Sequence, residues 1–176
     1  MTVDALAALE PACTSAEALA FYDGLDPLLA EHLTGRWRGR ELATGHPLDG
    51  RLAASGWYGK QFDDVDHVHP LLFSTPDGEI FPVDPRRVPL GLVDKIPPAV
   101  VSRGREALGV LRPALRTSKH RARLREVRHR GVVTAAMVYD HLPIIDVFRR
   151  VDDSTVLGMM DLRGVPQPYF FILQRD

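Results

Sequence analysis

The pentad Gly35-Arg36-Trp37-Arg38-Gly39 places one large aromatic side chain between two glycines. Glycine permits close backbone approach and positive φ, while tryptophan brings a large apolar face with a single N–H to satisfy. Residues 36–43 can run as a strand, with Trp37 on one face and the arginines on the other. Such a segment is suited to plug one end of a β-barrel.

The second half of the chain predicts five short strands. Tight turns separate them, and no helix lies between them to permit parallel crossovers. We therefore expect a mainly β fold, an antiparallel meander that forms a closed or nearly closed barrel. The predicted strands are 121–128, 132–139, 144–151, 155–161 and 169–174.

The first half predicts a short helical N-terminal cap and further strands. Thr14 and Glu17 have the spacing of a capping box, with a helix that ends near Gly24, and Pro27 can restart a helix that runs to Leu33. A helix then precedes the strand at Gly56-Trp57-Tyr58-Gly59-Lys60. The Pro76-Asp77-Gly78 turn predicts a hairpin between 69–74 and 79–83.

Two segments are expected to share one barrel. Residues 1–98 hold the helical cap and the pentad, and residues 99–176 hold the meander. The stretch 82–98 contains five prolines, which cannot donate to a strand ladder, so it is predicted to bridge the two segments.

Composition indicates what kind of protein this is but does not indicate its function. The chain has 176 residues, 45% hydrophobic residues and a formal net charge of -1, so no overall charge favours nucleic acid as a partner. A single cysteine excludes an internal disulfide. We find neither a signal peptide nor an apolar run of membrane-spanning length, and we expect a cytoplasmic protein.

The pentad, together with Gly56-Trp57-Tyr58-Gly59-Lys60, resembles the GXWXG protein family. The tail resembles the C-terminal domain of unknown function that accompanies that family, over residues 137–149, 158–161 and 169–173. The resemblance covers nearly the whole chain. It implies a fold, but the family carries no established activity or catalytic residues to transfer.

A looser likeness is to the calycins, in which lipocalins begin their first strand with Gly-x-Trp and nitrobindins with a glycine-flanked tryptophan. The likeness to lipocalins implies that Arg175, in the last strand, packs on Trp37 through a cation–π contact. The closing strand contains no histidine that could bind haem iron as in nitrobindins. We therefore expect no haem and no other cofactor.

An acidic loop carries a His-x-His pair, which on a strand would point both imidazoles to one face, where they could bind a divalent metal ion. No second His-x-His occurs in the chain to complete a familiar ligand set. We therefore predict a solvated loop that enters a strand, without a metal. The residues concerned are Asp63, Asp64, Asp66, His67 and His69.

Two residues are candidates for acid–base catalysis. Alternation along a strand puts Asp146 on the same face as Ile144 and Phe148, so an inward face would bury its carboxylate and require a partner. A buried aspartate with a raised pKa can serve as a general base. The second candidate is His141, which follows Tyr139-Asp140. The alternative to catalysis is a structural role for this segment in a turn or at a sheet edge.

Residues 112–130 contain eight lysines or arginines and only one acidic residue. One interpretation is a surface for anionic lipid headgroups, to which Arg121, Arg123 and Arg125 would contribute. The alternative is a solvated strand face that is protected by charge against edge pairing. Aromatic residues are not interleaved with the arginines, so stacking on nucleic-acid bases has little support.

Taken together, the sequence predicts a calycin-like barrel that binds a small hydrophobic or amphipathic ligand, with an anionic lipid as one alternative. A rival prediction is a small cavity enzyme of isomerase or hydrolase type that uses Asp146 or His141. A third prediction is a solid core without a cavity, in which case the protein acts through its outer surface. The sequence is also compatible with peripheral membrane contact and with a homodimer. The predicted ligand-binding residues are Trp37, Trp57, Tyr139, Phe148, Arg121, Arg123 and Arg125.

Overall fold

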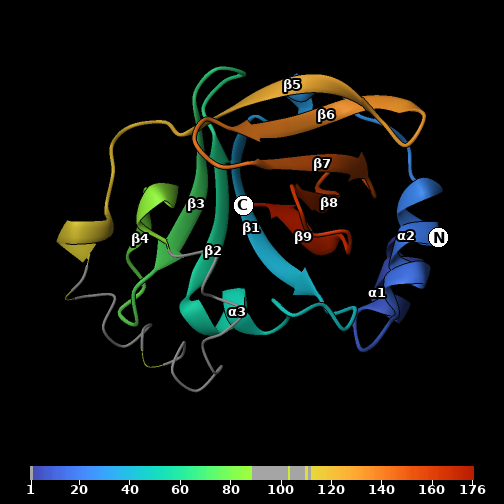
Figure 1. Ribbon diagram of the computed structural model, residues 1–176, viewed down its shortest axis with the longest axis horizontal. Coiled ribbons are helices and arrows are strands. Elements are labelled where there is room, and N and C mark those ends of the chain that lie inside the picture. The colour runs from blue at the N-terminus through green and yellow to red at the C-terminus, as the bar shows by residue number, and fades with distance from the viewer. Residues whose placement is uncertain (1, 89–102, 104–109, 111) are drawn as a thin grey trace.

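The computed structural model describes residues 2–88, 103, 110 and 112–176. Within these residues, nine strands form one antiparallel sheet in the order β2-β1-β9-β8-β7-β6-β5-β3-β4 (Figure 1). Strand β2 also pairs with β3, so all the strands except β4 close on themselves in a ring. The predicted mainly antiparallel β fold is confirmed.

The five strands predicted in the second half are present to within two residues at each end. Consecutive strands pair as antiparallel neighbours throughout this meander. The prediction works because each strand alternates inward and outward side chains between tight turns. The strands are β5 (Ala122–His129), β6 (Val132–Tyr139), β7 (Ile144–Arg150), β8 (Thr155–Leu162) and β9 (Tyr169–Arg175).

The first half supplies the remaining strands and the helices. The predicted hairpin is confirmed, since β3 and β4 pair on either side of Thr75–Gly78. The helix before Trp57 is also present. The elements are α1 (Thr2–Leu9), α2 (Ser15–Asp23), the 3-10 helix η1 (Ala30–Leu33), β1 (Gly35–Leu42), α3 (Arg51–Ser55), β2 (Trp57–Phe62), β3 (Val68–Ser74), β4 (Ile80–Pro82) and the 3-10 helix η2 (Pro85–Arg87).

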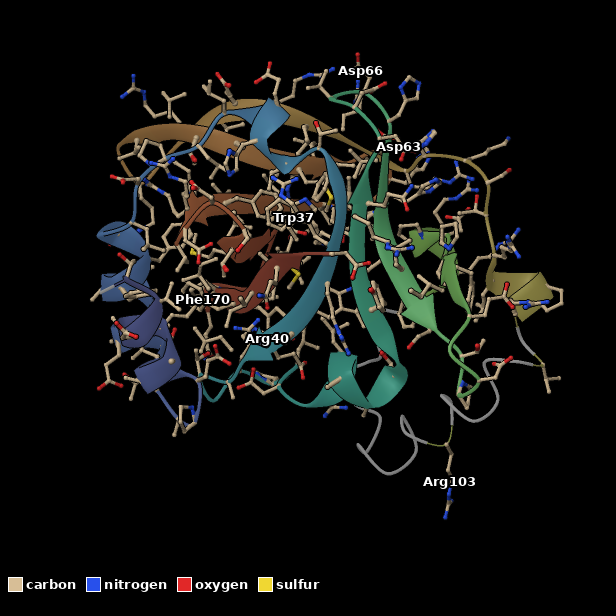
Figure 2. All side chains as sticks on the ribbon, turned by 180° about the vertical axis from the view of Figure 1, so that it is seen from behind. Trp37, Arg40, Asp63, Asp66, Arg103 and Phe170 are labelled. Carbon is tan, nitrogen blue, oxygen red and sulfur yellow. The ribbon has the colours of Figure 1, made fainter. Side chains whose placement is uncertain are left out.

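The helical part differs from the predicted cap in two respects. The capping box forms as predicted, with Thr14 N donating to Glu17 Oε2 at 2.7 Å and Glu17 N donating to Thr14 Oγ1 at 3.2 Å. However, α1 was not predicted, and the helix expected after Pro27 is a single 3-10 turn. The buried residues of α1 and α2 do not belong to the inner core of the ring. The two helices cover the outward faces of β8 and β9, where Leu6 and Tyr22 pack in the same cluster as Phe170 (Figures 1 and 2).

The inner face of the ring holds the larger core cluster, which includes Trp37, Phe62, Phe148 and Phe171. Leu28, Ala30 and Leu33, from the segment around η1, belong to this cluster. Trp37 is fully buried and donates its indole N–H to Leu33 O at 2.6 Å. The segment around η1, rather than the α-helices, therefore covers the inner core next to Trp37.

Strands from both halves of the chain form this one sheet, because β1 pairs with β9 and β3 pairs with β5. The boundary expected at residues 98 and 99 lies outside the described residues, as does most of the proline-rich stretch 82–98. No helix within the described residues has the length and apolar character needed to cross a membrane.

The two glycines of the pentad have different physical roles. Gly35 adopts φ +113°, a conformation that side-chain-bearing residues rarely adopt. A Cβ on Gly39 would lie 2.3 Å from the ring of Trp57, so this position must be bare for the second tryptophan to pack inside the ring. The pentad thus contributes Trp37 to the core, and through Gly39 it also leaves room for the Trp57 ring.

The cation–π contact predicted for Arg175 is present. Its guanidinium carbon lies 4.4 Å from the centroid of the Trp37 ring, and its nitrogens donate to Thr34 O and His32 O at 2.6 Å. Strand pairing explains this contact, because Trp37 and Arg175 are direct cross-strand partners.

Replacement of Arg175 by methionine is expected to lower the free energy of unfolding by about 1 to 2 kcal/mol, since a cation–π contact contributes roughly 0.5 to 2 kcal/mol and two hydrogen bonds are lost with it. Urea denaturation followed by tryptophan fluorescence measures this loss. The exposed neighbour Gln174 supplies the control, as Gln174→Met should change stability by less than about 0.5 kcal/mol. Equal stability of the Arg175→Met variant and the parent protein would show that the contact contributes nothing.

Candidate functional site

A buried ion pair lies inside the ring. Lys60 Nζ on β2 is 2.8 Å from Asp146 Oδ2 on β7, and the two side chains are only 3% and 2% exposed. Strand register turns both residues inward, because Lys60 is paired with Trp37 and Asp146 with Met137. The face that carries Asp146 is thus the inward one, so its carboxylate is buried and requires a partner, and Lys60 is that partner.

Aromatic side chains surround the ammonium group of Lys60. Nζ lies between 5.0 and 5.9 Å from the ring centroids of Trp57, Tyr139 and Phe171. It also donates to Pro70 O at 3.1 Å, and the Tyr139 hydroxyl is 3.5 Å away. Such cation–π contacts offset part of the cost of removing the charge from water.

Two polar atoms near this ion pair have no hydrogen-bond partner. They are Asp146 Oδ1 and Trp57 Nε1, both buried from solvent. Buried polar groups in native proteins are almost always paired, and each unpaired group costs roughly 1 to 3 kcal/mol. One acceptor and one donor beside the ion pair are therefore unsatisfied within the described residues.

Burial alters the acid–base properties of these groups. It raises the pKa of Asp146 above its ordinary value, and the opposing effect of Lys60 only partly offsets this. Burial, followed by the nearby charge of Asp146, also raises the pKa of Tyr139 well above that of an exposed tyrosine. Burial thus shifts the pKa of Asp146 upwards, towards the range in which carboxylates act as general bases.

The wall of the ring opens near Trp57. The ladder between β1 and β2 runs from Gly35–Phe62 to Arg38–Gly59, although β1 continues to Leu42. Where the two strands separate there is a pocket of about 240 Å³. Its lining residues are Arg38, Gly39, Arg40, Glu41, Ala53, Gly56, Trp57, Tyr58 and Ser74. Trp57 therefore lines the surface pocket and also lies near Lys60 of the buried pair.

Glu41 at this opening is held by interior hydrogen bonds. Its Oε1 accepts from the Tyr169 hydroxyl at 2.6 Å and from Leu52 N at 3.1 Å, and Oε2 accepts from Gly50 N at 3.1 Å. Burial and the neighbouring carboxylate raise the pKa of Tyr169. These bonds tie the segment around α3 to β1 and β9, and they position one rim of the pocket.

The structure separates the two predicted catalytic residues. His141 is exposed in the loop between β6 and β7, whereas Asp146 is buried. Trp57 and Tyr139 gather around Lys60, next to Asp146. Trp37 and Phe148 are fully buried members of the inner cluster, and Phe148 packs edge-on against Phe171.

The arginines predicted for lipid headgroups each have a carboxylate partner. Arg121 is 2.8 Å from Asp84, Arg123 is 3.2 Å from Asp140, and Arg125 is 2.7 Å from Asp66. Hydrogen bonds from Arg86, assisted by the charge of Arg121, hold the pKa of Asp84 well below its usual range. The basic segment therefore carries less unbalanced charge than its composition suggests.

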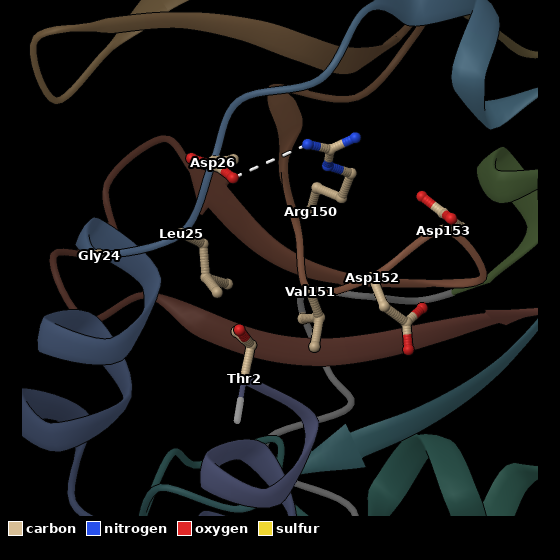
Figure 3. Close-up of a pocket in the computed structure, with 8 residues that line it drawn as sticks. All are labelled: Thr2, Gly24, Leu25, Asp26, Arg150, Val151, Asp152 and Asp153. Atoms are coloured by element: carbon tan, nitrogen blue, oxygen red, sulfur yellow. Dashed lines mark ion pairs between the residues drawn. The ribbon is translucent and has the colours of Figure 1, made fainter.

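A second surface pocket, of about 290 Å³, lies where α2 ends beside the turn between β7 and β8 (Figure 3). Leu25, Val151 and several polar side chains line it, and Asp26 and Arg150 form an ion pair at 3.7 Å across it. None of the predicted site residues contributes to this pocket. It is less suited to an amphipathic ligand than the pocket at Trp57.

Lys60 is the site residue that sequence reasoning missed. The pattern Gly56-Trp57-Tyr58-Gly59-Lys60 predicts a strand start and contributes to the family resemblance, but it assigns no role to Lys60. Alternation places Trp57 and Lys60 on opposite faces, but β-bulges within β2 shift the register so that both point inward. A lysine three residues after a buried tryptophan gives no sequence signal of an inward position.

Comparison with known proteins supports the resemblance seen in the sequence. A profile described as GXWXG protein matches residues 20–78, and a profile described as domain of unknown function (DUF4334) matches residues 120–175. A crystal structure of a protein from Thermomonospora curvata is 36% identical and covers 98% of this chain and 99% of its own, with a TM-score of 0.72. The chain belongs to the GXWXG family.

Among curated proteins, none matches this GXWXG protein. The family assignment therefore explains the pentad and the meander, while the activity has to be argued from the site. Both family segments contribute to that site, because Trp57 and Lys60 lie in the first and Tyr139 and Asp146 in the second.

Proposed function

We propose that this GXWXG protein binds a small amphipathic molecule at the opening between β1 and β2, and that its ring of strands serves as a calycin-like barrel. The observation that carries the proposal is the surface pocket lined by Trp57, whose ring also lies 5.9 Å from the ammonium group of the buried Lys60–Asp146 pair. Binding sites are usually concave and largely apolar, with a few polar groups that fix orientation.

The size and chemistry of the pocket restrict the class of ligand. At about 240 Å³ the pocket is slightly below the usual size for drug-like ligands, which favours a small molecule. Trp57 offers an apolar face, while Arg38 on the rim offers a cation. A short alkyl or aryl chain with a carboxylate or a similar anionic group matches both features.

The first test is native mass spectrometry of the purified protein, followed by organic extraction under denaturing conditions. We expect a stoichiometric mass excess that disappears on denaturation. Tryptophan fluorescence then gives an affinity, because Trp37 and Trp57 are the two tryptophans of the chain. We expect decanoate to change this fluorescence saturably and decanol to do so with lower affinity.

Two neighbouring arginines provide a matched control. Arg36 and Arg38 both lie near the Tyr58 ring, but only Arg38 lines the pocket, whereas Arg36 pairs with Asp176 at 2.5 Å. Arg38→Gln should weaken decanoate binding about tenfold and leave decanol binding nearly unchanged. Arg36→Gln should affect neither. An apo mass together with no fluorescence response to either probe would refute the proposal.

A second candidate function is proton transfer by Asp146. The supporting observation is its buried carboxylate, which has one oxygen without a partner and a raised pKa. Such a group can remove a proton next to a carbonyl, as a general base of the isomerase type does. Lys60 and Tyr139 are near enough to the carboxylate to stabilise developing negative charge.

This candidate can be tested without a known substrate. NMR in D₂O would measure exchange of the α-protons of 2-decanone with and without the protein. General-base catalysis predicts accelerated exchange that Asp146→Asn abolishes, while His141→Gln, which changes an exposed loop residue, retains it. Equal exchange rates for the parent protein and Asp146→Asn would eliminate Asp146 as the base.

Contact with an anionic membrane through Arg121, Arg123 and Arg125 is also testable. Cosedimentation with phosphatidylglycerol vesicles should be reduced by the triple replacement with glutamate if these residues bind headgroups. Because all three are already in ion pairs, we expect weak cosedimentation even of the parent protein at physiological salt.

A further inference from the structure

Three metal-ligating side chains meet on the outside of the ring, away from the pocket at Trp57. Asp63 directly follows β2, His69 lies on β3, and His120 precedes β5. One possible ligand atom from each of the three lies within 4.8 Å of the other two. Figure 2 labels Asp63 and the nearby Asp66 at the ends of these strands.

Strand pairing brings these distant residues together. His69 is the cross-strand partner of Gln61, and Asp63 N donates to His67 O at 2.9 Å, which holds the turn between β2 and β3. Arg121 N donates to Val68 O at 3.0 Å, which places His120 beside the same turn. The cluster is therefore positioned by backbone hydrogen bonds rather than by flexible side chains alone.

The contacts within the cluster suit a metal ion. His120 Nε2 lies 2.8 Å from Asp63 Oδ2, and Gln61 Nε2 donates to Asp63 Oδ1 at 2.7 Å. The rings of His69 and His120 have centroids 4.4 Å apart and are tilted by 35°. His69 Nδ1 is buried and has no hydrogen-bond partner. Two adjacent imidazoles and a carboxylate thus contain an unsatisfied nitrogen, which points to a missing ligand.

We propose that Asp63, His69 and His120 bind a first-row divalent transition metal ion of the Zn²⁺ type. Zn²⁺ prefers imidazole nitrogen and carboxylate oxygen at about 2.0 to 2.2 Å, and three protein ligands leave a fourth position for water. The ion takes the place of the proton shared between Asp63 and His120. Gln61 serves as the outer partner that orients the Asp63 carboxylate.

The site lies where the ring closes. The β3–β5 seam has Val68–Ala122 as its strand pair, whereas neighbouring β5 and β6 pair along their whole length. A metal ion bound by residues beside β2, β3 and β5 would join the two sides of this seam. We infer that it stabilises the closed ring, since a ligand that binds only the folded state raises stability.

The test uses protein without an affinity tag, first treated with EDTA and then titrated with Zn²⁺ by calorimetry. We expect saturable binding of one ion with a Kd below about 10 μM and an increase in Tm of several degrees that EDTA reverses. Co²⁺ provides a second readout, as its visible absorption reports coordination by nitrogen and oxygen. Absence of saturable Zn²⁺ binding below 100 μM would refute the proposal.

Variants distinguish this site from nonspecific binding by surface histidines. His69→Gln and His120→Gln should each weaken Zn²⁺ binding at least 100-fold, whereas metal-free Tm should stay within a few degrees of the parent protein. His67 is the matched control, because its ring lies 4.9 Å from that of His120 while its Nδ1 pairs with Asp64 at 2.8 Å. His67→Gln should change affinity less than about threefold. Parent-like Zn²⁺ affinity in His120→Gln would overturn the assignment.

Discussion

Replacement of Lys60 by methionine is expected to lower the free energy of unfolding by about 3 to 5 kcal/mol. The change removes the ammonium group 2.8 Å from Asp146 and leaves a carboxylate buried inside the ring without its counter-charge. Methionine has nearly the same length, so the loss reports electrostatics rather than a cavity. Urea denaturation at pH 7, followed by tryptophan fluorescence, measures it.

A double variant tests whether the cost comes from the isolated charge. Lys60→Met combined with Asp146→Leu removes both charges, and its stability should return to within about 2 kcal/mol of the parent protein. Arg130→Met is the matched surface control, because it breaks the exposed Arg130–Asp23 pair at a cost of about 0 to 1 kcal/mol. A Lys60→Met variant as stable as Arg130→Met would show that the buried pair contributes little.

The same variant should show a characteristic dependence on pH. The folded protein raises the pKa of Asp146, so the native state binds more protons than the unfolded state, and stability falls as pH rises from about 3.9 towards the folded pKa. Loss of Lys60 raises the pKa of Asp146 further, so stability falls over a wider range of pH. The destabilisation by Lys60→Met should therefore be smaller at pH 4.5 than at pH 7. A destabilisation that increases on acidification would contradict this account.

Replacement of Gly59 by alanine is expected to lower the free energy of unfolding by about 3 kcal/mol or more. Gly59 has φ +151°, and a Cβ there would lie 2.0 Å from Trp37 O and 2.9 Å from Gly39 N. Both neighbours are backbone atoms, so the conflict can be relieved only if β1 and β2 move apart. Denaturation of the variant and loss of amide-exchange protection at Arg38 and Lys60 would measure the effect.

A second glycine serves as the control for this substitution. Gly24 ends α2 with φ -81°, and the nearest atom to an added Cβ is 3.5 Å away. Gly24→Ala should change stability by less than about 1 kcal/mol, because the conformation and the space both accept alanine. If Gly59→Ala were equally mild, β1 and β2 would not pack as closely as the structure shows.

Local patterns account for what was predictable in this fold. The meander of β5 to β9 follows from alternating side chains between tight turns, and the Pro76-Asp77-Gly78 turn predicts its hairpin through backbone preferences alone. The same alternation puts Asp146 on one face with Ile144 and Phe148, and the structure shows that this face points inward. Arg175 was placed on Trp37 through the resemblance to lipocalins, and the β1–β9 pairing confirms it.

Two residues of the candidate sites, Lys60 and His120, were missed because their positions depend on contacts between distant segments. His120 lies in a stretch dominated by basic residues, 51 positions after His69, and only the β3–β5 pairing brings them together. The helix α1 escaped prediction because its buried residue, Leu6, packs on the outer face of the sheet, a tertiary contact that local patterns do not reveal.

The sequence by itself determined the strand pattern, the turns and the suitability of Gly35 for a positive φ, because these depend on the conformational limits of individual residues and on alternation within one strand. Only the tertiary structure decided that Lys60 is the partner of Asp146 and that His69 faces His120. The physical reason is register. Bulges in β2 and the closure of β3 on β5 select which side chains meet, and these choices depend on the free energy of the whole ring rather than on any single segment.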